Sequence, residues 1–223
     1  MKTGLVVALL FVLIAGVQPS LAQTSTVDIT DTALVLDYTD PEPNPTSEIR
    51  GFIISGRGTT GFGATWTGTG ITSSTAAADV IINPESTSVA YAHNGSLPLG
   101  PYANFLGRAI DDSSVLIRYT RTGDANLNGV VDDDDVTILG ATYGPGVPQP
   151  AWALGDFDYN GFVDDDDATL LGVFYDPSAA PISAAAPATT ASGVAAVPEP
   201  STWLMLVLGG LGLFGWRRSY RKT

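Results

Sequence analysis

Two copies of one acidic loop carry the residues of this chain best suited to chemistry. The first runs from Asp124 to Asp135 and the second from Asp156 to Asp167, 32 residues later. In each copy, carboxylates and carboxamides stand at loop positions 1, 3, 5, 9 and 12, with glycine at position 6 and valine at position 8. A calcium loop has this spacing, because alternate positions of a curled loop aim oxygens inward and glycine permits the sharp turn.

The sequence therefore predicts two calcium ions, each held by side-chain oxygens and by the backbone carbonyl at position 7. The predicted ligands are Asp124, Asn126, Asn128, Val130, Asp132 and Asp135 in the first loop, and Asp156, Asp158, Asn160, Phe162, Asp164 and Asp167 in the second.

The segments that follow the loops, 136–143 and 168–175, also repeat each other. Their apolar residues share roughly one helical face, which predicts a helix after each loop. Neither unit can bury such a face alone, so we expect the two to pack together. Val131 and Val163 at position 8 are expected to pair the loops, and residues 151–154 to add to the core.

The repeats resemble the type I dockerin family over residues 122–176. This resemblance implies two calcium ions and a helix face that docks a cohesin-like module or another surface protein. It differs at positions 10 and 11, where dockerins that assemble cellulosomes carry Ser-Thr-like pairs. Aspartates stand there instead. The matching residues are Gly123-Asp124, Asn126, Asn128-Gly129, Val131, Asp135, Leu139, Gly155-Asp156, Asp158, Asn160-Gly161, Val163, Asp167 and Leu171.

The charge of the chain is strongly negative, with 23 acidic against 10 basic residues. Eleven acidic residues and no basic one lie between Asp124 and Asp167. With no cationic patch to neutralise phosphates, nucleic acid is excluded as a partner. The chain has no cysteine, so its stability must come from core and metal. We expect residues 122–176 to fold only with calcium bound.

The N-terminal 22 residues have the features of a secretory signal peptide. Lys2 precedes an apolar run over residues 4–16 that is too short to span a membrane, and small residues follow at 20–22. The pattern predicts cleavage after Ala22. The alternative is an uncleaved anchor.

The C-terminal segment 198–223 has three parts: the motif Pro198-Glu199-Pro200, an apolar stretch from Trp203 to Trp216, and a basic tail that begins with Arg217 and Arg218. A helix from Pro198 to Trp216 would be about 28 Å long, against about 30 Å of hydrocarbon. This favours one transmembrane helix with the tail in the cytoplasm. An ordinary tail anchor is the alternative.

As a set, these parts resemble the PEP-CTERM sorting signal. The resemblance implies that an exosortase-type protease removes a transient inner-membrane anchor. The protein would then reach the cell surface or extracellular matrix of a Gram-negative-type bacterium.

Residues 23–121 are expected to form a β-rich domain, a small antiparallel β-sandwich-like fold, because short apolar runs alternate with turn residues. The expected strands are 26–30, 33–38, 51–55, 79–82, 88–91 and 114–119. The last runs directly into the first loop, so the β domain and the repeats are expected to pack together. Parts of 49–119 resemble a planctomycete-type exported tail module. Residues 177–197 are expected to be a Pro/Ala/Ser/Thr linker. The fold class is thus mixed β and α.

Evidence for catalysis is sparse, since His93 is the only histidine and no nucleophile motif accompanies it. Paired carboxylates of a hydrolase are one alternative, with Glu48, Asp79, Glu85, Asp111 and Asp112 as candidates. A polysaccharide-binding surface is another, because aromatic rings stack on sugars. Its candidates are Phe62, Trp66, Tyr91 and Tyr102. The interpretation that the residues favour is a non-enzymatic, exported protein that uses calcium-stabilised repeats for assembly or adhesion.

Overall fold

The computed structural model describes residues 26–38 and 43–183. The predicted signal peptide and sorting signal lie outside this part, together with Ala22, Pro198, Glu199, Pro200, Arg217 and Arg218, and so does most of the predicted linker. Among the described residues, the helices are all too short or too polar to cross a membrane.

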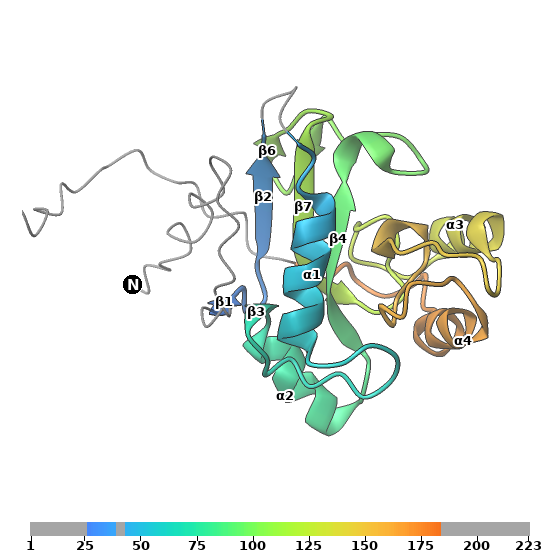
Figure 1. Cartoon of the computed structure of the whole chain (residues 1–223). Helices are drawn as coiled ribbons and strands as arrows, with labels where there is room; N and C mark the ends of the chain where they lie inside the picture. The colour runs from blue at the N-terminus through green and yellow to red at the C-terminus, as the bar shows by residue number, and fades with distance from the viewer. Residues whose placement is uncertain (1–25, 39–42, 184–223) are drawn as a thin grey trace, which may run out of the picture. The chain divides into compact units, whose positions relative to one another are not determined.

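A three-stranded antiparallel sheet forms the centre of the N-terminal part, by which we mean the described residues up to 121 (Figure 1). Its order is β2 (Ala33–Asp37), β7 (Ser114–Arg121) and β4 (Thr87–His93). The middle strand β7 is almost entirely buried, and its apolar residues 115–117 lie in the core. These three strands confirm the predictions for 33–38, 88–91 and 114–119.

Two smaller sheets complete the strands. β1 (Thr26–Asp28) pairs in parallel with β3 (Gly70–Thr72), and β5 (Asn104–Phe105) pairs antiparallel with β6 (Arg108–Ala109). A 3-10 turn, η2 (Asn94–Ser96), follows β4. The strand predicted at 26–30 is therefore present but shorter.

The strands predicted at 51–55 and 79–82 are wrong, because both segments are helical. α1 (Thr46–Arg57) buries Ile49 and Ile53, four residues apart, so its apolar residues follow the helical period. α2 (Ser74–Ile82) begins at Ser73, whose hydroxyl caps the backbone N–H of Ala76 at 2.9 Å. A sandwich of two sheets is thus replaced by a sheet with helices packed on it.

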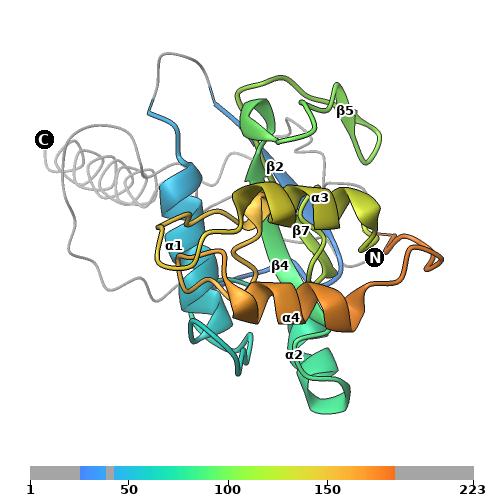
Figure 2. The ribbon, with the colours of Figure 1, turned by 90° about the vertical axis from the view of Figure 1, so that its right-hand side faces the viewer.

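The C-terminal part consists of two loop–helix units, as predicted. α3 (Asp133–Thr142) follows the first loop, α4 (Asp165–Phe174) follows the second, and the 3-10 turn η3 (Trp152–Leu154) connects the units. Both helices begin at loop position 10, earlier than expected. Figure 2 shows α3 and α4 beside each other in front of the sheet.

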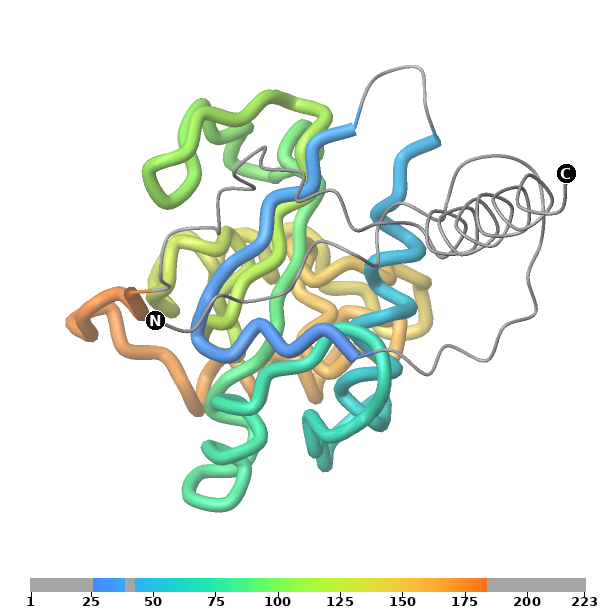
Figure 3. Tube along the Cα trace, turned by 90° about the vertical axis from the view of Figure 1, so that its left-hand side faces the viewer, coloured from blue at the N-terminus to red at the C-terminus, as the bar shows by residue number. Residues whose placement is uncertain are grey.

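The two parts share one hydrophobic core, which confirms the expected packing. Trp152 is fully buried and its indole N–H donates to the carbonyl of Asp124 at 2.7 Å. The hydroxyl of Tyr91 on β4 donates to the carbonyl of Pro150 at 3.1 Å. β4 is thus the edge strand that meets the C-terminal part, while β1 and β2 lie on the far side, in front in Figure 3.

The last residue of the predicted repeats, Asp176, and the first residues of the predicted linker are attached to the first loop. The N–H of Asp176 donates to the carbonyl of Val131 at 3.1 Å, and the N–H of Ile182 donates to the carbonyl of Gly129 at 3.0 Å. Arg118 and Arg121 donate to the carbonyls of Ile182 and Ala180. Residues 176–182 therefore belong to the folded unit rather than to a free spacer.

Candidate metal centre

The two loops adopt the same backbone conformation. Leu127 and Tyr159 at position 4 both have φ of 65°, and Gly129 and Gly161 at position 6 have φ of 95° and 97°. These left-handed values suit glycine and are rare for other residues, so the chain curls in the same way twice.

The carboxylates at position 12 are pinned inside the loops by backbone N–H groups. Both are fully buried. In the first loop, Asp135 accepts from Ala125, Asn126 and Asp132 at 2.8, 3.2 and 2.9 Å. In the second, Asp167 accepts from Phe157, Asp158 and Asp164 at 2.7, 3.3 and 3.0 Å. The donors stand at positions 2, 3 and 9 in both loops, so the two networks are equivalent.

The carboxylates at position 1 are held by the glycine turn. Asp124 accepts the N–H of Gly129 at 2.8 Å, and Asp156 accepts the N–H of Gly161 at 3.1 Å. Their remaining partners differ, since the hydroxyl of Thr120 donates to Asp124 whereas the guanidinium of Arg50 donates to Asp156 at 3.0 Å.

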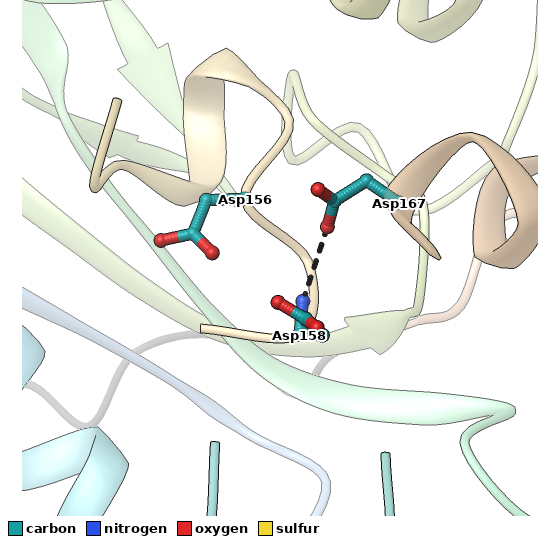
Figure 4. A group of neighbouring side chains, drawn as sticks. All are labelled: Asp156, Asp158 and Asp167. Carbon is teal, nitrogen blue, oxygen red and sulfur yellow. Dashed lines mark hydrogen bonds between the residues drawn. The ribbon is translucent and has the colours of Figure 1, made fainter. Parts of the chain in front are cut away.

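Three carboxylates of the second loop converge on one point (Figure 4). One oxygen from each of Asp156, Asp158 and Asp167 lies within 4.8 Å of the other two, and all three residues are buried. Oxygens on opposite sides of a Ca²⁺ ion stand about 5 Å apart, at 2.3–2.6 Å from the ion. In the first loop, Asn126 stands at the position of Asp158, so the equivalent set there is two carboxylates and one carboxamide.

A second observation indicates that these loops suit a hard cation. The ion pairs among the described residues are Arg50–Asp156, Arg57–Glu85 and Arg108–Asp37. In that part of the chain, Asp135, Asp158 and Asp167 are buried without any cationic partner. Buried carboxylates without a cation are costly, and bound calcium would supply the missing charge.

The aspartates at position 9 are not among the converging carboxylates. Asp132 and Asp164 are the N-caps of α3 and α4, and their side chains accept the N–H groups of Asp134 and Asp166 at 3.0 and 3.1 Å. At position 5, Asn128 and Asn160 each accept the N–H of position 7 at 2.8 Å. Val130 and Phe162 at position 7 are therefore anchored by hydrogen bonds that form the turn.

Burial controls the pKa values of the carboxyls. It raises the pKa of Asp135 to about 7, with a further contribution from the charge of Asp124. It likewise raises the pKa of Asp167 to about 7 and of Asp124 to about 6. The pKa values of Asp156 and Asp158 are also raised by burial. Asp135 and Asp167 are therefore protonated in part near neutral pH without a cation, and a metal must displace those protons.

Val131 and Val163 connect the two units through their backbone carbonyls. Both residues are fully buried; the carbonyl of Val163 accepts from the N–H of Gly144 at 3.0 Å, and that of Val131 accepts from the N–H of Asp176 at 3.1 Å. Each loop is thus bound by the residue that follows the helix of the other unit. The exchange continues in the side chains, because Tyr143 donates to Asp165 and Tyr175 to Asp133.

Three arginines that no sequence pattern assigned to the loops are their neighbours: Arg50, Arg118 and Arg121. Arg50 donates to the carbonyl of Tyr159 at 2.9 Å, and Arg118 donates to the equivalent carbonyl of Leu127. Arg121 donates to the carbonyl of Gly129 at 2.6 Å. No pattern in the sequence links Arg50 to a loop more than 100 residues away.

We predict that Gly129→Ala is more destabilising than Gly161→Ala. Both substitutions place a side chain at positive φ, which costs roughly 1–2 kcal/mol. A Cβ at Gly129 would also lie 2.6 Å from Arg118 Nη2 and 3.0 Å from the backbone nitrogen of Ile182, whereas the nearest atom at Gly161 is 4.0 Å away. Urea denaturation in calcium should show an additional loss of about 1–3 kcal/mol for Gly129→Ala. Equal losses would contradict the docking of residues 176–182.

The aromatic candidates for a sugar-binding surface are divided by the fold. Trp66 and Tyr91 lie in the core with exposed fractions of 1% and 2%, so the alternative of a sugar-binding surface is wrong for these two. Tyr102 is half-buried and donates to the carbonyl of Asn126 at 2.9 Å, while Phe62 is exposed.

The candidate hydrolase residues occupy separate environments. Glu85 is buried and accepts from Arg57, Gly63 and Ala64. Asp79 accepts from Tyr119 and Thr87 at 2.6 and 2.8 Å. The others are exposed on α1 or in the turn before β7: Glu48, Asp111 and Asp112. His93 contacts the hydroxyls of Tyr38 and Ser96 at 2.8 and 3.0 Å.

Comparison with known proteins identifies one feature of the chain. A family model for the PEP-CTERM protein-sorting motif matches residues 196–222, which confirms the resemblance seen at 198–223. The motif indicates export, transient membrane anchoring through the C-terminal region and processing by an exosortase. Neither the curated proteins nor the solved structures include a match to this chain.

Proposed function

We propose that this chain is a non-enzymatic, exported surface or matrix protein whose paired dockerin-like loops bind two calcium ions. The ions would hold the C-terminal part in a fixed shape for assembly with a partner protein. One observation carries the proposal: two loops with equivalent hydrogen-bond networks each enclose buried carboxylates. Oxygen-rich cages of this kind suit calcium, which takes six to eight oxygen ligands.

The outer side of the repeats supports a role in assembly. Apolar residues are exposed on and after α3 and α4: Val136, Tyr143, Val147, Val173 and Tyr175. Aspartates at positions 10 and 11 lie beside them and are also exposed. A partner would therefore present apolar and basic groups, and a cohesin-like module is one candidate.

The test combines two measurements on protein isolated from its own cells. Native mass spectrometry should find two calcium ions per chain. Peptide mapping should find termini near Gln23 and Pro198 if both targeting segments are removed. A chain that carries no calcium after dialysis against millimolar Ca²⁺ would refute the metal sites, and an intact C-terminus would refute cleavage alone.

We predict that calcium binding weakens as the pH falls from 8 to 6. Relative to their ordinary pKa of 3.8, Asp135 and Asp167 are raised to about 7 in the folded chain. In the metal-free chain, protonation of these two carboxyls contributes to the free energy of unfolding. This contribution is fully present below pH 3.8 and is lost as the pH rises through about 7. Calcium requires the ionised form, so the bound state has the opposite dependence.

Below pH 7, each displaced proton should weaken the apparent affinity about tenfold per pH unit. Calorimetry at pH 6 and 8, in two buffers of different ionisation enthalpy, measures both the affinity and the protons released. An affinity that stays constant over this range, with no proton release, is the contrary result.

A polysaccharide-binding role remains a second candidate because of one pocket. It has a volume of about 270 Å³ and lies between the loop after β4 and the first calcium loop. Carboxamides, a carboxylate and a tyrosine ring line it beside apolar groups, a mixture that suits a sugar ring. The lining includes Leu97, Leu99, Tyr102, Asn126, Asn128 and Asp134.

A further inference from the structure

The two loops differ by one negative charge among their inward-facing residues. Positions 1 and 12 are aspartates in both loops, but position 3 is Asn126 in the first and Asp158 in the second. Asn126 and Asp158 have the same backbone contact, since each accepts the N–H of position 5, at 2.9 and 2.8 Å. The extra carboxylate therefore changes the charge of the second loop while its turn stays the same.

Arg50 supplies the opposite charge at the second loop. Its Nη2 lies 3.0 Å from Oδ2 of Asp156 and 2.9 Å from the carbonyl oxygen of Tyr159. The Asp156 side chain is fully buried and that of Arg50 is 20% exposed, so solvent screens this pair only in part.

The arginine at the first loop has different contacts. Arg118 donates to the carbonyls of Leu127 and Ile182, and the position-1 carboxylate there accepts the neutral hydroxyl of Thr120 instead. Among the described residues, the ion pair between a loop carboxylate and an arginine is thus confined to the loop with three inward-facing aspartates.

We propose that Arg50 is a charge-balancing residue that offsets the extra carboxylate of Asp158 and sets the calcium affinity of the second loop. When only arginines within ion-pair distance of a loop carboxylate are counted, the inward-facing groups of either loop carry a net charge of about −2, which matches one divalent cation. This inference rests on the proposed calcium function and adds the residue that tunes it.

Two consequences follow from the position of Arg50. In the absence of metal it stabilises the ionised Asp156 and connects α1 to the second loop. In the presence of metal its positive charge opposes the incoming cation, so the loop binds calcium less tightly than three carboxylates alone would allow. Removal of this charge should therefore tighten calcium binding and destabilise the metal-free chain.

The experiment is a calcium titration of the full chain in mild detergent, followed by NMR. The amides of Gly129 and Gly161 report the loops separately, because each donates to the position-1 carboxylate of its own loop. Arg50→Gln should tighten binding at the second loop about tenfold and leave the first within about twofold. It should also lower the midpoint of thermal unfolding in EDTA.

A double variant tests whether the charges of Arg50 and Asp158 offset each other at the second loop. Asp158→Asn alone should weaken the second loop about tenfold, and Arg50→Gln combined with Asp158→Asn should return it to the wild-type affinity. Arg50→Lys, which keeps the charge, should also bind as the wild type does. Arg108→Gln is the matched control, because it removes one positive charge from an exposed pair with Asp37 away from the loops.

The outcomes distinguish a failure of this inference from a failure of the proposed calcium function. If neither glycine amide of the wild type responds to calcium, the metal sites themselves are refuted. If both respond but Arg50→Gln weakens the second loop or leaves it unchanged, only the role of Arg50 is overturned. A double variant whose second loop does not return to the wild-type affinity would also overturn it.

Discussion

Removal of calcium should destabilise the two loop–helix units and lower the midpoint of thermal unfolding by about 10–20 °C. Each ion at 100 times its dissociation constant contributes about 2.7 kcal/mol, so two sites contribute about 5 kcal/mol. One kcal/mol corresponds to about 2–4 °C in a chain of this size. Buried Asp135, Asp158 and Asp167 would be left without a compensating charge. Circular dichroism at 222 nm, recorded on heating with calcium and with EDTA, measures the change.

Re-addition of calcium should restore the signal, and an equal concentration of magnesium should not. Mg²⁺ demands octahedral ligands at 2.0–2.1 Å and gives up its water reluctantly, so these loops suit it poorly. Helicity that is the same in EDTA and in calcium would show that the units fold without metal.

The unfolding should extend beyond the loops because the core is shared. Trp152, Phe157 and Tyr159 are fully buried against each other, and the hydroxyl of Tyr159 donates to the carbonyl of Val89 on β4. Loss of the second loop would expose this edge of the sheet. Calcium would thus stabilise the N-terminal part through packing, even though its predicted ligands all lie after β7.

The loops and their helices were predictable because their information is local. Ligand spacing, the glycine at position 6 and the apolar period after position 12 all lie within about 20 residues of one another. The helix starts were placed late because the apolar period begins only after position 12, whereas Asp132 and Asp164 are the N-caps in the structure. An aspartate suits both roles, and the sequence does not distinguish them.

The errors in the N-terminal part come from short β-branched runs. Phe52-Ile53-Ile54 was interpreted as strand, although Ile49 and Ile53 already show a four-residue spacing and Gly58 follows with φ of 87°. In α2, the run Val80-Ile81-Ile82 favoured a strand, yet Ile81 and Ile82 are each 84% exposed. A run of this length is compatible with a helix or a strand, and the tertiary context determines which one forms.

Long-range partners were beyond local analysis. Arg50 meets Asp156 and Tyr159 only because α1 packs against β4 and η3 brings the second loop to the same edge. The reciprocal contacts of Tyr143 and Tyr175 depend in the same way on how the two units pack. Only the folded structure shows that these residues are parts of the site.

Asp167→Asn should reduce the calcium content from two ions to one per chain. The substitution removes one charge from the group of three carboxylates and replaces one oxygen with an N–H donor. That donor would face backbone N–H groups, since Asp167 accepts from Phe157, Asp158 and Asp164 through both of its oxygens. We expect the affinity of the second loop to fall on the order of 100-fold, because ligand charge sets calcium affinity. Calorimetry measures the stoichiometry and the affinity together.

Asp166→Asn is the matched control, because it makes the same chemical change at the adjacent residue. Asp166 is exposed and contributes to the network through its backbone N–H, which the substitution preserves. It should bind two ions with nearly unchanged affinity. In EDTA, Asp167→Asn should unfold at a lower temperature than Asp166→Asn, because its amide donor would face backbone N–H groups. The number of ions bound by the folded variants therefore decides: one ion in Asp167→Asn and two in Asp166→Asn identify Asp167 as a ligand, whereas two ions bound by Asp167→Asn would remove it from the site.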